Sequence, residues 1–287
     1  MEIEQEEKRY MKHLEVLNRS SETILGYGKD IKSFRRFDTV KYNGPVYVED
    51  ITRDDIESFL YYLKEERKLA PASISRAQYT LRSFFNYLYG NNYIRSNPTA
   101  MLEAVKIPQK ERPFLSQDES LQLANAIKNR IIKTVILFLF YTGLRISECC
   151  NLEIGDVNLT ENIVNVRAGK GNKDRIVPIN TTLHEILEDY VENVRPTIDM
   201  KRFFATHKTG KLSPQYVNRE IKIAVKKLKW DKQISAHSLR HSYASALISK
   251  NVNIVHVSKL LGHSSVKVTS IYAHSNIEQL REAVENL

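Results

Sequence analysis

The chain has 287 residues and a formal net charge of +9, with 43 lysine or arginine residues against 34 aspartate or glutamate residues. This length fits one large domain or two ordinary ones, and a hydrophobic content of 42% argues against disorder. We find no run of about 18 apolar residues and no apolar signal segment in the acidic N-terminal stretch, so we expect neither a membrane span nor secretion. The cysteines are the neighbours Cys149 and Cys150, which excludes a disulfide framework and favours a reducing cytosol.

Residues 8–95 have the pattern of helices joined by short turns. Ser73–Tyr89 repeats apolar residues at helical spacing between Pro71 and Gly90, and Thr52 is a candidate N-cap ahead of two acidic residues. Arg76 and Arg82 fall off the apolar stripe, which makes them candidates to face a polyanion such as DNA. We therefore predict a helical domain over residues 1–95.

Residues 96–112 are predicted to form an extended linker, because they hold Pro98 and Pro108, no glycine and little periodicity, and Pro113 follows. After it, helical patterns cover Ser116–Asn129, Ile131–Thr142 and Gly143–Asn151.

Two short β-branched runs, Ile163–Ala168 and Arg175–Ile179, flank Gly169-Lys170-Gly171-Asn172-Lys173-Asp174. This is typical of a hairpin, with Pro178 marking an edge strand. The predicted fold class is therefore mainly α with a small antiparallel β-sheet in the second domain, residues 113–287.

Basic residues gather in the segment 201–232, which holds ten of them against Glu220 and Asp231. Four follow a spacing of three, four and three residues, which places them on one ridge of an amphipathic helix: Arg219, Lys222, Lys226 and Lys229. Such a ridge suits a phosphate backbone, although an ordinary solvated surface explains the charge alone equally well.

Six residues of the second domain carry groups suited to attack on a phosphodiester: Arg145, Lys170, His237, Arg240, His263 and Tyr272. A guanidinium forks two donors onto phosphate oxygens, and a pentavalent phosphorane gains negative charge that fixed guanidinium donors favour. A hairpin lysine can protonate a leaving oxygen, and a tyrosine can attack if its phenol is activated. Each residue also has an ordinary structural explanation, such as an ion pair between Arg145 and Glu148.

A metal site is not expected here. His241 lies four residues beyond His237, but the glutamate of a zinc H-E-x-x-H motif is missing and no acidic ligand is near. The same helix, Ala236–Ser249, places His237 and Arg240 on one face.

In this order, the contexts T-G-L-R-I-S-E, G-K-G-N-K-D-R-I-V-P, H-S-L-R-H and L-G-H-S-S, with a tyrosine nine residues after His263, resemble the tyrosine recombinase (phage integrase) family. The Xer branch is the most similar. The resemblance implies a two-domain C-shaped clamp on DNA, with residues 1–95 as the helical, SAM-like core-binding domain and 113–287 as the catalytic domain.

The resemblance also implies a role for each residue. Tyr272 would be the nucleophile, Arg145 and Arg240 the phosphate clamp, and Lys170 the general acid for the 5′-oxygen. His237 and His263 would activate the nucleophile or help to hold the phosphate. The candidate DNA contacts are Arg76, Arg82, Lys173, Arg219, Lys222, Lys226 and Lys229.

No metal, ATP or other cofactor is expected, because a 3′-phosphotyrosyl intermediate conserves the bond energy. The partners expected are double-stranded DNA with inverted-repeat half-sites, three further copies of the chain in a tetramer, and a DNA translocase as candidate regulator. Strand exchange in pairs through a Holliday junction at a dif-like site, in the cytoplasm at the nucleoid, would resolve chromosome dimers. The amphipathic segment Asn276–Leu287 would dock in a groove of its own subunit or of a neighbour.

Other functions remain open at this stage. A mobile-element or plasmid integrase would use the same chemistry, and so would a relaxing enzyme resembling type IB topoisomerases. A DNA-binding protein with a relict catalytic set and a metal-dependent nuclease are the remaining alternatives.

Overall fold

The structure is a computed structural model, which describes residues 1–108, 113–167, 174–197, 201–263, 265 and 269. The chain divides into two compact units, Met1–Lys110 and Glu111–Leu287. The described part is mostly helical and includes a small antiparallel sheet, which confirms the predicted fold class. Among the described residues, no helix is long and apolar enough to cross a membrane.

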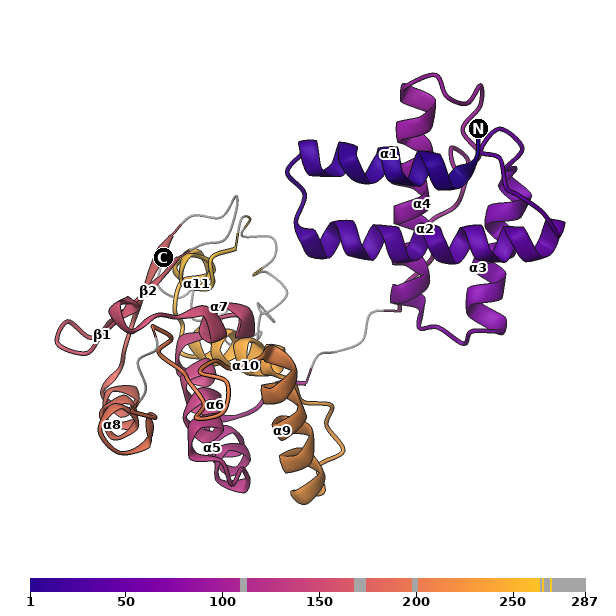
Figure 1. Cartoon of the computed structure of the whole chain (residues 1–287). Coiled ribbons are helices and arrows are strands. Elements are labelled where there is room, and N and C mark those ends of the chain that lie inside the picture. The colour runs from indigo at the N-terminus through magenta and orange to yellow at the C-terminus, as the bar shows by residue number, and fades with distance from the viewer. Residues whose placement is uncertain (109–112, 168–173, 198–200, 264, 266–268, 270–287) are drawn as a thin grey trace, which may run out of the picture. The chain divides into compact units, whose positions relative to one another are not determined.

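The first unit is built from four helices, α1 (Ile3–Val16), α2 (Ser21–Tyr42), α3 (Arg53–Glu65) and α4 (Pro71–Gly90). Within this unit α1 and α2 lie side by side, and both pack against α4 (Figure 1). Thr52 caps α3 as predicted, in a capping box with Asp55 that satisfies backbone N–H groups at the start of the helix.

The second unit places helices around a three-stranded sheet (Figure 1). Its elements are α5 (Gln117–Ala126), α6 (Arg130–Thr142), α7 (Ile146–Asn151), a 3-10 turn (Ile154–Asp156), β1 (Val157–Asn158), β2 (Ile163–Val166), β3 (Arg175–Pro178), α8 (Thr181–Asp189), a π-helical turn (Tyr190–Val194), α9 (Pro214–Lys227), α10 (Ala236–Ser249) and α11 (Ile254–Leu261).

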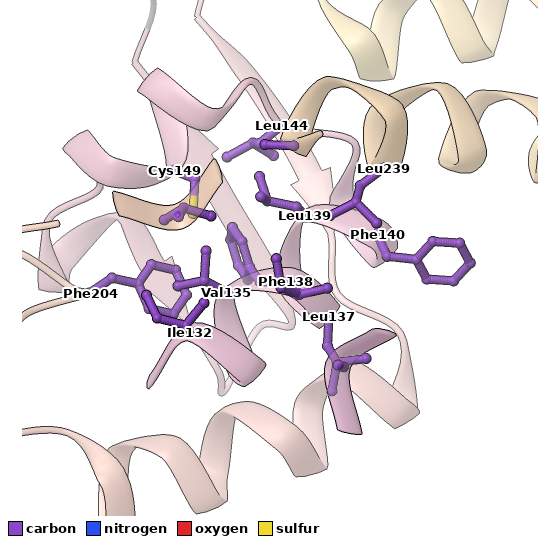
Figure 2. Close-up of a cluster of buried hydrophobic side chains, with 14 of the residues drawn as sticks. Ile132, Val135, Leu137, Phe138, Leu139, Phe140, Leu144, Cys149, Phe204 and Leu239 are labelled. Carbon is purple, nitrogen blue, oxygen red and sulfur yellow. The ribbon is translucent and has the colours of Figure 1, made fainter. Parts of the chain in front are cut away.

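Helix α6 forms the centre of the second unit. Ten of its thirteen residues are buried, and Ile132, Val135 and Phe138 meet Phe204 and other apolar side chains in a dense cluster (Figure 2). Since a helix that is apolar on nearly all sides must be surrounded, α6 acts as the support for its neighbours. The largest contact of α6 is with α10, which carries His237 and Arg240.

The sheet has the order β1-β2-β3 and is antiparallel throughout. The predicted hairpin is present as β2 and β3, in a register that pairs Val166 with Arg175. Pro178 lies on an edge strand as predicted, where its missing N–H leaves no gap in the ladder. The two-residue strand β1 was not predicted, because two residues carry no readable alternation.

Two of the expected helix bounds were wrong. Gly143 does not begin a helix: its φ of +63° is left-handed and it ends α6, while Arg145 is the N-cap of α7. Lys229 lies beyond the end of α9 and has a φ of +55°. The predicted cationic ridge therefore includes only its first three residues on the helix.

Gly143 is required both by its backbone conformation and by its surroundings. A Cβ at this position would lie 2.3 Å from Cδ1 of Tyr243 and 3.0 Å from Cδ2 of Leu261. We expect Gly143→Ala to lower the free energy of unfolding of the second unit by about 2–4 kcal/mol, from the left-handed φ and overpacking together.

The measurement is chemical denaturation followed by fluorescence of Trp230, the one tryptophan of the chain, which packs against the core of the second unit. Gly155→Ala is the matched control, since a Cβ there meets nothing within 4 Å. Its effect should stay within about 0.5 kcal/mol. Equal unfolding midpoints for the two variants would contradict the conclusion that position 143 requires glycine.

Candidate active site

Arg145 is held in place by Glu148, three residues further along the chain. The backbone N–H of Arg145 donates to Oε2 of Glu148 at 2.7 Å, and Nη1 of Arg145 donates to Oε1 at 2.8 Å. This is one half of a capping box, in which the N3 carboxylate accepts from the N-cap backbone N–H, and the N-cap guanidinium donates to the same carboxylate. The side chain of Arg145 keeps 39% of its surface exposed, so it is anchored without being covered.

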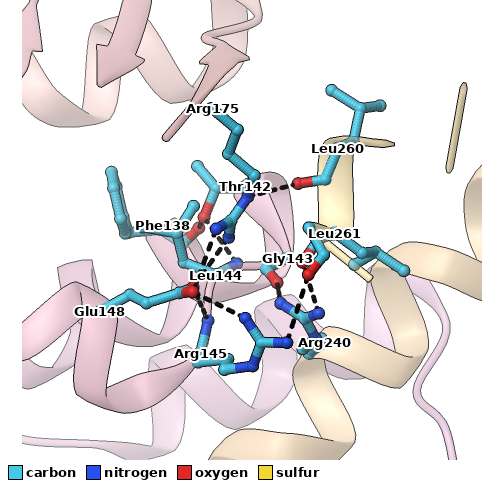
Figure 3. A network of polar contacts seen from close by, with 11 residues as sticks. Phe138, Thr142, Gly143, Leu144, Arg145, Glu148, Arg175, Arg240, Leu260 and Leu261 are labelled. Atoms are coloured by element: carbon cyan, nitrogen blue, oxygen red, sulfur yellow. Dashed lines mark hydrogen bonds and ion pairs between the residues drawn. The ribbon is translucent and has the colours of Figure 1, made fainter. Parts of the chain in front are cut away.

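Arg175, the first residue of β3, makes the second set of contacts to Glu148. Its Nη1 and Nη2 donate to Oε1 and Oε2 at 3.0 and 2.8 Å, and its Nε donates to the carbonyl of Leu260 at 2.8 Å (Figure 3). Burial alone would raise the pKa of Glu148. The hydrogen bonds from Arg175 and Arg145 outweigh this and lower the pKa to about 2, so Glu148 is ionised at neutral pH.

Arg240 is buried, with 2% of its surface exposed, and it binds the carbonyl ends of two helices. Its Nη1 donates to the carbonyl of Gly143 at 2.8 Å, and its Nη2 donates to the carbonyl of Leu261 at 2.6 Å (Figure 3). Arg145 approaches the same place, with Nη2 at 3.5 Å from the carbonyl of Gly262. The two arginines of the predicted clamp are therefore brought together by the ends of α6 and α11.

His263 follows directly after α11 and lies in the field of this arginine cluster. Its pKa is lowered to about 4, first by burial and then by the positive charges of Arg240, Arg145 and Arg175, with a smaller contribution from His237. His263 is therefore neutral at pH 7. Its Nδ1 lies 2.8 Å from the hydroxyl of the buried Thr269, which leaves Nε2 as the nitrogen that would meet a phosphate.

His237 stands on the exposed side of α10, one turn before the buried Arg240. Its ring packs edge-on against that of His241, with centroids 4.8 Å apart. His237 also contributes to the lowered pKa of His263. Of the six predicted catalytic residues, Arg145, Arg240 and His263 converge at the end of α11, and His237 lies one turn from Arg240 on α10.

The other two predicted catalytic residues, Lys170 and Tyr272, lie outside the described residues, as do Lys173 and the segment 276–287. In the described part of the chain, no group of three or more His, Cys, Asp or Glu side chains is arranged to hold a metal ion.

The candidate DNA contacts of the first unit are engaged within that unit. Nη1 of Arg76 lies 2.8 Å from the carboxylate of the buried Asp30, although 55% of the arginine side chain is exposed. Nη2 of Arg82 donates to the carbonyl of Leu102 at 2.6 Å, and this side chain is half-buried. DNA binding by either arginine stays a prediction.

The basic face of α9 is solvent-exposed as predicted. Arg219, Lys222 and Lys226 are all exposed, whereas Ile221 on the opposite face is fully buried. Arg219 also lies 5.0 Å from the ring of Tyr216, which restrains its orientation.

Arg175 was not predicted as a site residue, and Glu148 was considered only as an ordinary ion-pair partner for Arg145. The signal for Arg175 was its position in G-K-G-N-K-D-R-I-V-P, directly after the hairpin turn. Three guanidiniums with a single carboxylate leave the cluster with an excess of positive charge. This arrangement suits an anion that accumulates charge during reaction.

Comparison with known proteins identifies the family to which the chain belongs. Residues 113–279 match the phage integrase family, and residues 8–92 match the phage integrase N-terminal SAM-like domain. The chain belongs to the phage integrase family of tyrosine recombinases, DNA strand-transferases that act through a phosphotyrosine intermediate.

Within that family the chain is of the XerC/XerD type. It is 33% identical to XerD of Staphylococcus saprophyticus over 92% of this chain and 91% of that protein, and 32% identical to XerC of Thermodesulfovibrio yellowstonii over 93% and 90%. A tyrosine recombinase of Thermosipho africanus is 36% identical over 97% of this chain and 96% of the relative.

Solved structures agree on the fold. The XerA recombinase is 28% identical with a TM-score of 0.54, covering 99% of this chain and 98% of that one. The Tn1549 transposon integrase in complex with a circular intermediate DNA has a TM-score of 0.83 at 19% identity, covering both chains completely. Lambda integrase (residues 75–356), a dimer bound to a core site, has a TM-score of 0.78 at 23% identity, covering 93% of this chain and 97% of that one.

The protonation state of His263 gives a direct check of the site. Since its folded-state pKa of about 4 lies below the usual 6.5, neutral His263 contributes stability that is complete above pH 6.5 and is lost as the pH falls toward 4. Long-range proton–nitrogen NMR of the imidazoles should show a neutral ring down to about pH 5. The resonance is assigned by its absence in His263→Gln, and titration near pH 6.5 would contradict the arrangement.

Proposed function

We propose that the protein is a site-specific DNA recombinase in which Tyr272 attacks the phosphate held by this arginine cluster. The observation that carries the proposal is the convergence of Arg145, Arg240 and the neutral His263 at the joined ends of α6 and α11. All three can donate hydrogen bonds to non-bridging phosphate oxygens, and they occupy fixed positions before any substrate binds. Donors that need no reorganisation favour the transition state.

The proposed reaction is a balanced transesterification. The phenolic oxygen of Tyr272 forms a bond to phosphorus while the bond to the 5′-oxygen of the next nucleotide breaks, and Lys170 protonates that oxygen. In the proposed step His237 accepts the phenolic proton of Tyr272 as the new bond forms and returns it when Tyr272 is released, while His263 binds the phosphate. A 5′-hydroxyl from a second strand then attacks the 3′-phosphotyrosine and releases Tyr272, so no metal or nucleotide cofactor is consumed.

The helical first domain (1–95) and the catalytic domain (113–287), joined by residues 96–112, are proposed to close as a C-shaped clamp around duplex DNA with inverted-repeat half-sites. Four copies would exchange strands in pairs through a Holliday junction, with the segment Asn276–Leu287 docked on its own or a neighbouring subunit. The candidate DNA contacts are Arg76, Arg82, Lys173, Arg219, Lys222, Lys226 and Lys229.

Similarity to XerC and XerD proteins over more than 90% of the chain supports a Xer-like role. We place that role in the cytoplasm, in resolution of chromosome dimers at a dif-like site, with a DNA translocase as candidate regulator. Recombination between two copies of an inverted repeat that the protein binds is the assay for it. Mobile-element integration is the second candidate, because a transposon integrase shares the fold.

The nucleophile is tested with a nicked duplex that traps the cleaved state. The unmodified protein should form a covalent protein–DNA adduct, resolved by denaturing electrophoresis, in EDTA as well as without it. Tyr272→Phe lacks the attacking oxygen, so its adduct should fall by at least about 10⁴-fold while DNA binding is retained. An equal adduct with Tyr272→Phe would show that another residue attacks, and loss of all cleavage in EDTA would favour a metal-dependent nuclease.

The basic face of α9 is tested by salt dependence. If Lys226 neutralises one phosphate, Lys226→Met should weaken binding to all sequences alike and reduce the slope of log K against log salt by about 1. Lys227→Met is the matched control on the same helix, because Nζ of Lys227 donates instead to the carbonyl of Ala126 at 3.3 Å. Equal salt slopes for the two variants would show that Lys226 does not contact a DNA phosphate.

A further inference from the structure

We propose that Arg175 is a positioning residue for strand cleavage, which acts through Glu148 to hold Arg145 in the geometry that meets the phosphate. The inference rests on the proposed function, since it concerns the same site. It assigns a role to a residue that makes no contact with the reacting atoms in the proposed mechanism. Its side chain is 7% exposed, against 39% for Arg145, so Arg175 supports the cluster from the inside.

The contacts of Glu148 define how this support works. Its two carboxylate oxygens accept four N–H groups within 3.0 Å, two from Arg145 and two from Arg175. A bidentate fork fixes the plane of a carboxylate, which a single point charge cannot do. The plane of Glu148 in turn fixes Nη1 of Arg145, so the orientation of the exposed arginine depends on the buried one.

Arg175 also controls the charge that Arg145 presents. Without Arg175, the full charge of Glu148 would be balanced by Arg145 alone, and the attraction of Arg145 for a phosphate would fall. With Arg175 in place, one carboxylate is shared between two guanidiniums. Together with Arg240, the cluster then has three positive charges against one negative charge, and each of the three guanidiniums donates to a carbonyl at the C-terminal end of α11.

A third contact extends the effect to His263. Nε of Arg175 donates to the carbonyl of Leu260, and a Cβ on Gly262 would lie 3.0–3.2 Å from Nη1, Cδ and Cζ of Arg175. Arg175 therefore packs directly on the backbone that leads from α11 into His263. One side chain thus links β3, the start of α7 and the end of α11 (Figure 3).

The test compares Arg175→Met with Arg175→Lys in single-turnover cleavage of the nicked duplex by the full-length protein. Arg175→Met removes the charge and the fork, and it should slow formation of the covalent adduct by at least about tenfold with little change in DNA affinity. Arg175→Lys restores the charge without the bidentate fork, so its rate should lie between that of the unmodified protein and that of Arg175→Met. The matched control is Arg130→Met, which breaks the surface ion pair with Asp189 and should leave the rate unchanged.

A pH profile separates positioning from loss of folded protein. Glu148 is faced by Arg145 and Arg175, with Arg240 and His263 in the same cluster. In Arg175→Met, burial is opposed by fewer hydrogen bonds, so the pKa of Glu148 should rise from about 2. Protonation of Glu148 removes the acceptor that orients Arg145, and we expect this loss to outweigh the gain in net positive charge. The rate relative to the unmodified protein should therefore fall further as the pH is lowered toward the raised pKa of Glu148. In a Glu148→Gln background this additional pH dependence should vanish.

The outcomes are distinct from those that test the proposed function. If the unmodified protein forms no adduct, the proposed function fails and the role of Arg175 falls with it. The folded fraction of Arg175→Met is measured from its cooperative unfolding signal, and its cleavage rate is expressed per folded molecule. If the unmodified protein forms the adduct and Arg175→Met cleaves at the same rate, only the inference about Arg175 is wrong. If Arg175→Met slows cleavage by the same factor in the unmodified and in the Glu148→Gln backgrounds, the inference is also wrong, because the effect would then not pass through Glu148.

Discussion

The Glu148 carboxylate, shared by Arg145 and Arg175, is the interaction on which the arrangement of the site depends. A buried carboxylate costs several kcal/mol unless it is paired and hydrogen-bonded, and Glu148 meets this demand with four N–H donors. The lowered pKa of Glu148 shows that these hydrogen bonds and charges outweigh the cost of burying the carboxylate. Because the donors come from the start of α7 and from β3, satisfying the charge also fixes these two elements relative to each other. Glu148 is therefore a structural requirement that also fixes the position of Arg145, the arginine proposed to bind the phosphate.

Helix ends supply the other half of the site. The chain leaves both α6 and α11 through a left-handed glycine, Gly143 and Gly262, and the carbonyl of Gly143 and that of Leu261 both bind Arg240. Carbonyls at a helix C-terminus lack intrahelical partners and carry partial negative charge, so a buried guanidinium satisfies them while they stabilise it. The charges that would meet a phosphate are therefore oriented during folding and need little reorganisation when DNA binds. The neutral state of His263 follows from the same concentration of positive charge.

Rules of helix capping, helical spacing and hairpin formation predicted much of the fold from the sequence. The Thr52 cap, the bounds of α10 and the β2–β3 hairpin follow from spacing within a few residues, and the structure confirms them. The pair between Glu148 and Arg175 joins residues 27 positions apart in different elements, so no periodicity reveals it. Gly143 was expected to begin a helix, whereas it ends α6 in the left-handed conformation common for a glycine at a helix C-terminus. Its close neighbours Tyr243 and Arg240 lie far along the chain, so the sequence did not reveal them. Arg82 was expected to face outward, yet its bond to the carbonyl of Leu102 arises from packing of a later segment.

The arginine cluster is proposed to balance the charge on the attacked phosphate. This role is tested most directly with a nicked duplex whose cleaved phosphate carries a neutral methyl group in place of one non-bridging oxygen. Single-turnover cleavage of this duplex and of the ordinary one is compared for the unmodified protein and Arg145→Ala. If the cluster balances this charge, the large loss of rate that Arg145→Ala causes on the ordinary phosphate should be mostly removed on the neutral one, because less negative charge then needs a partner. A loss of the same size on both duplexes would contradict it.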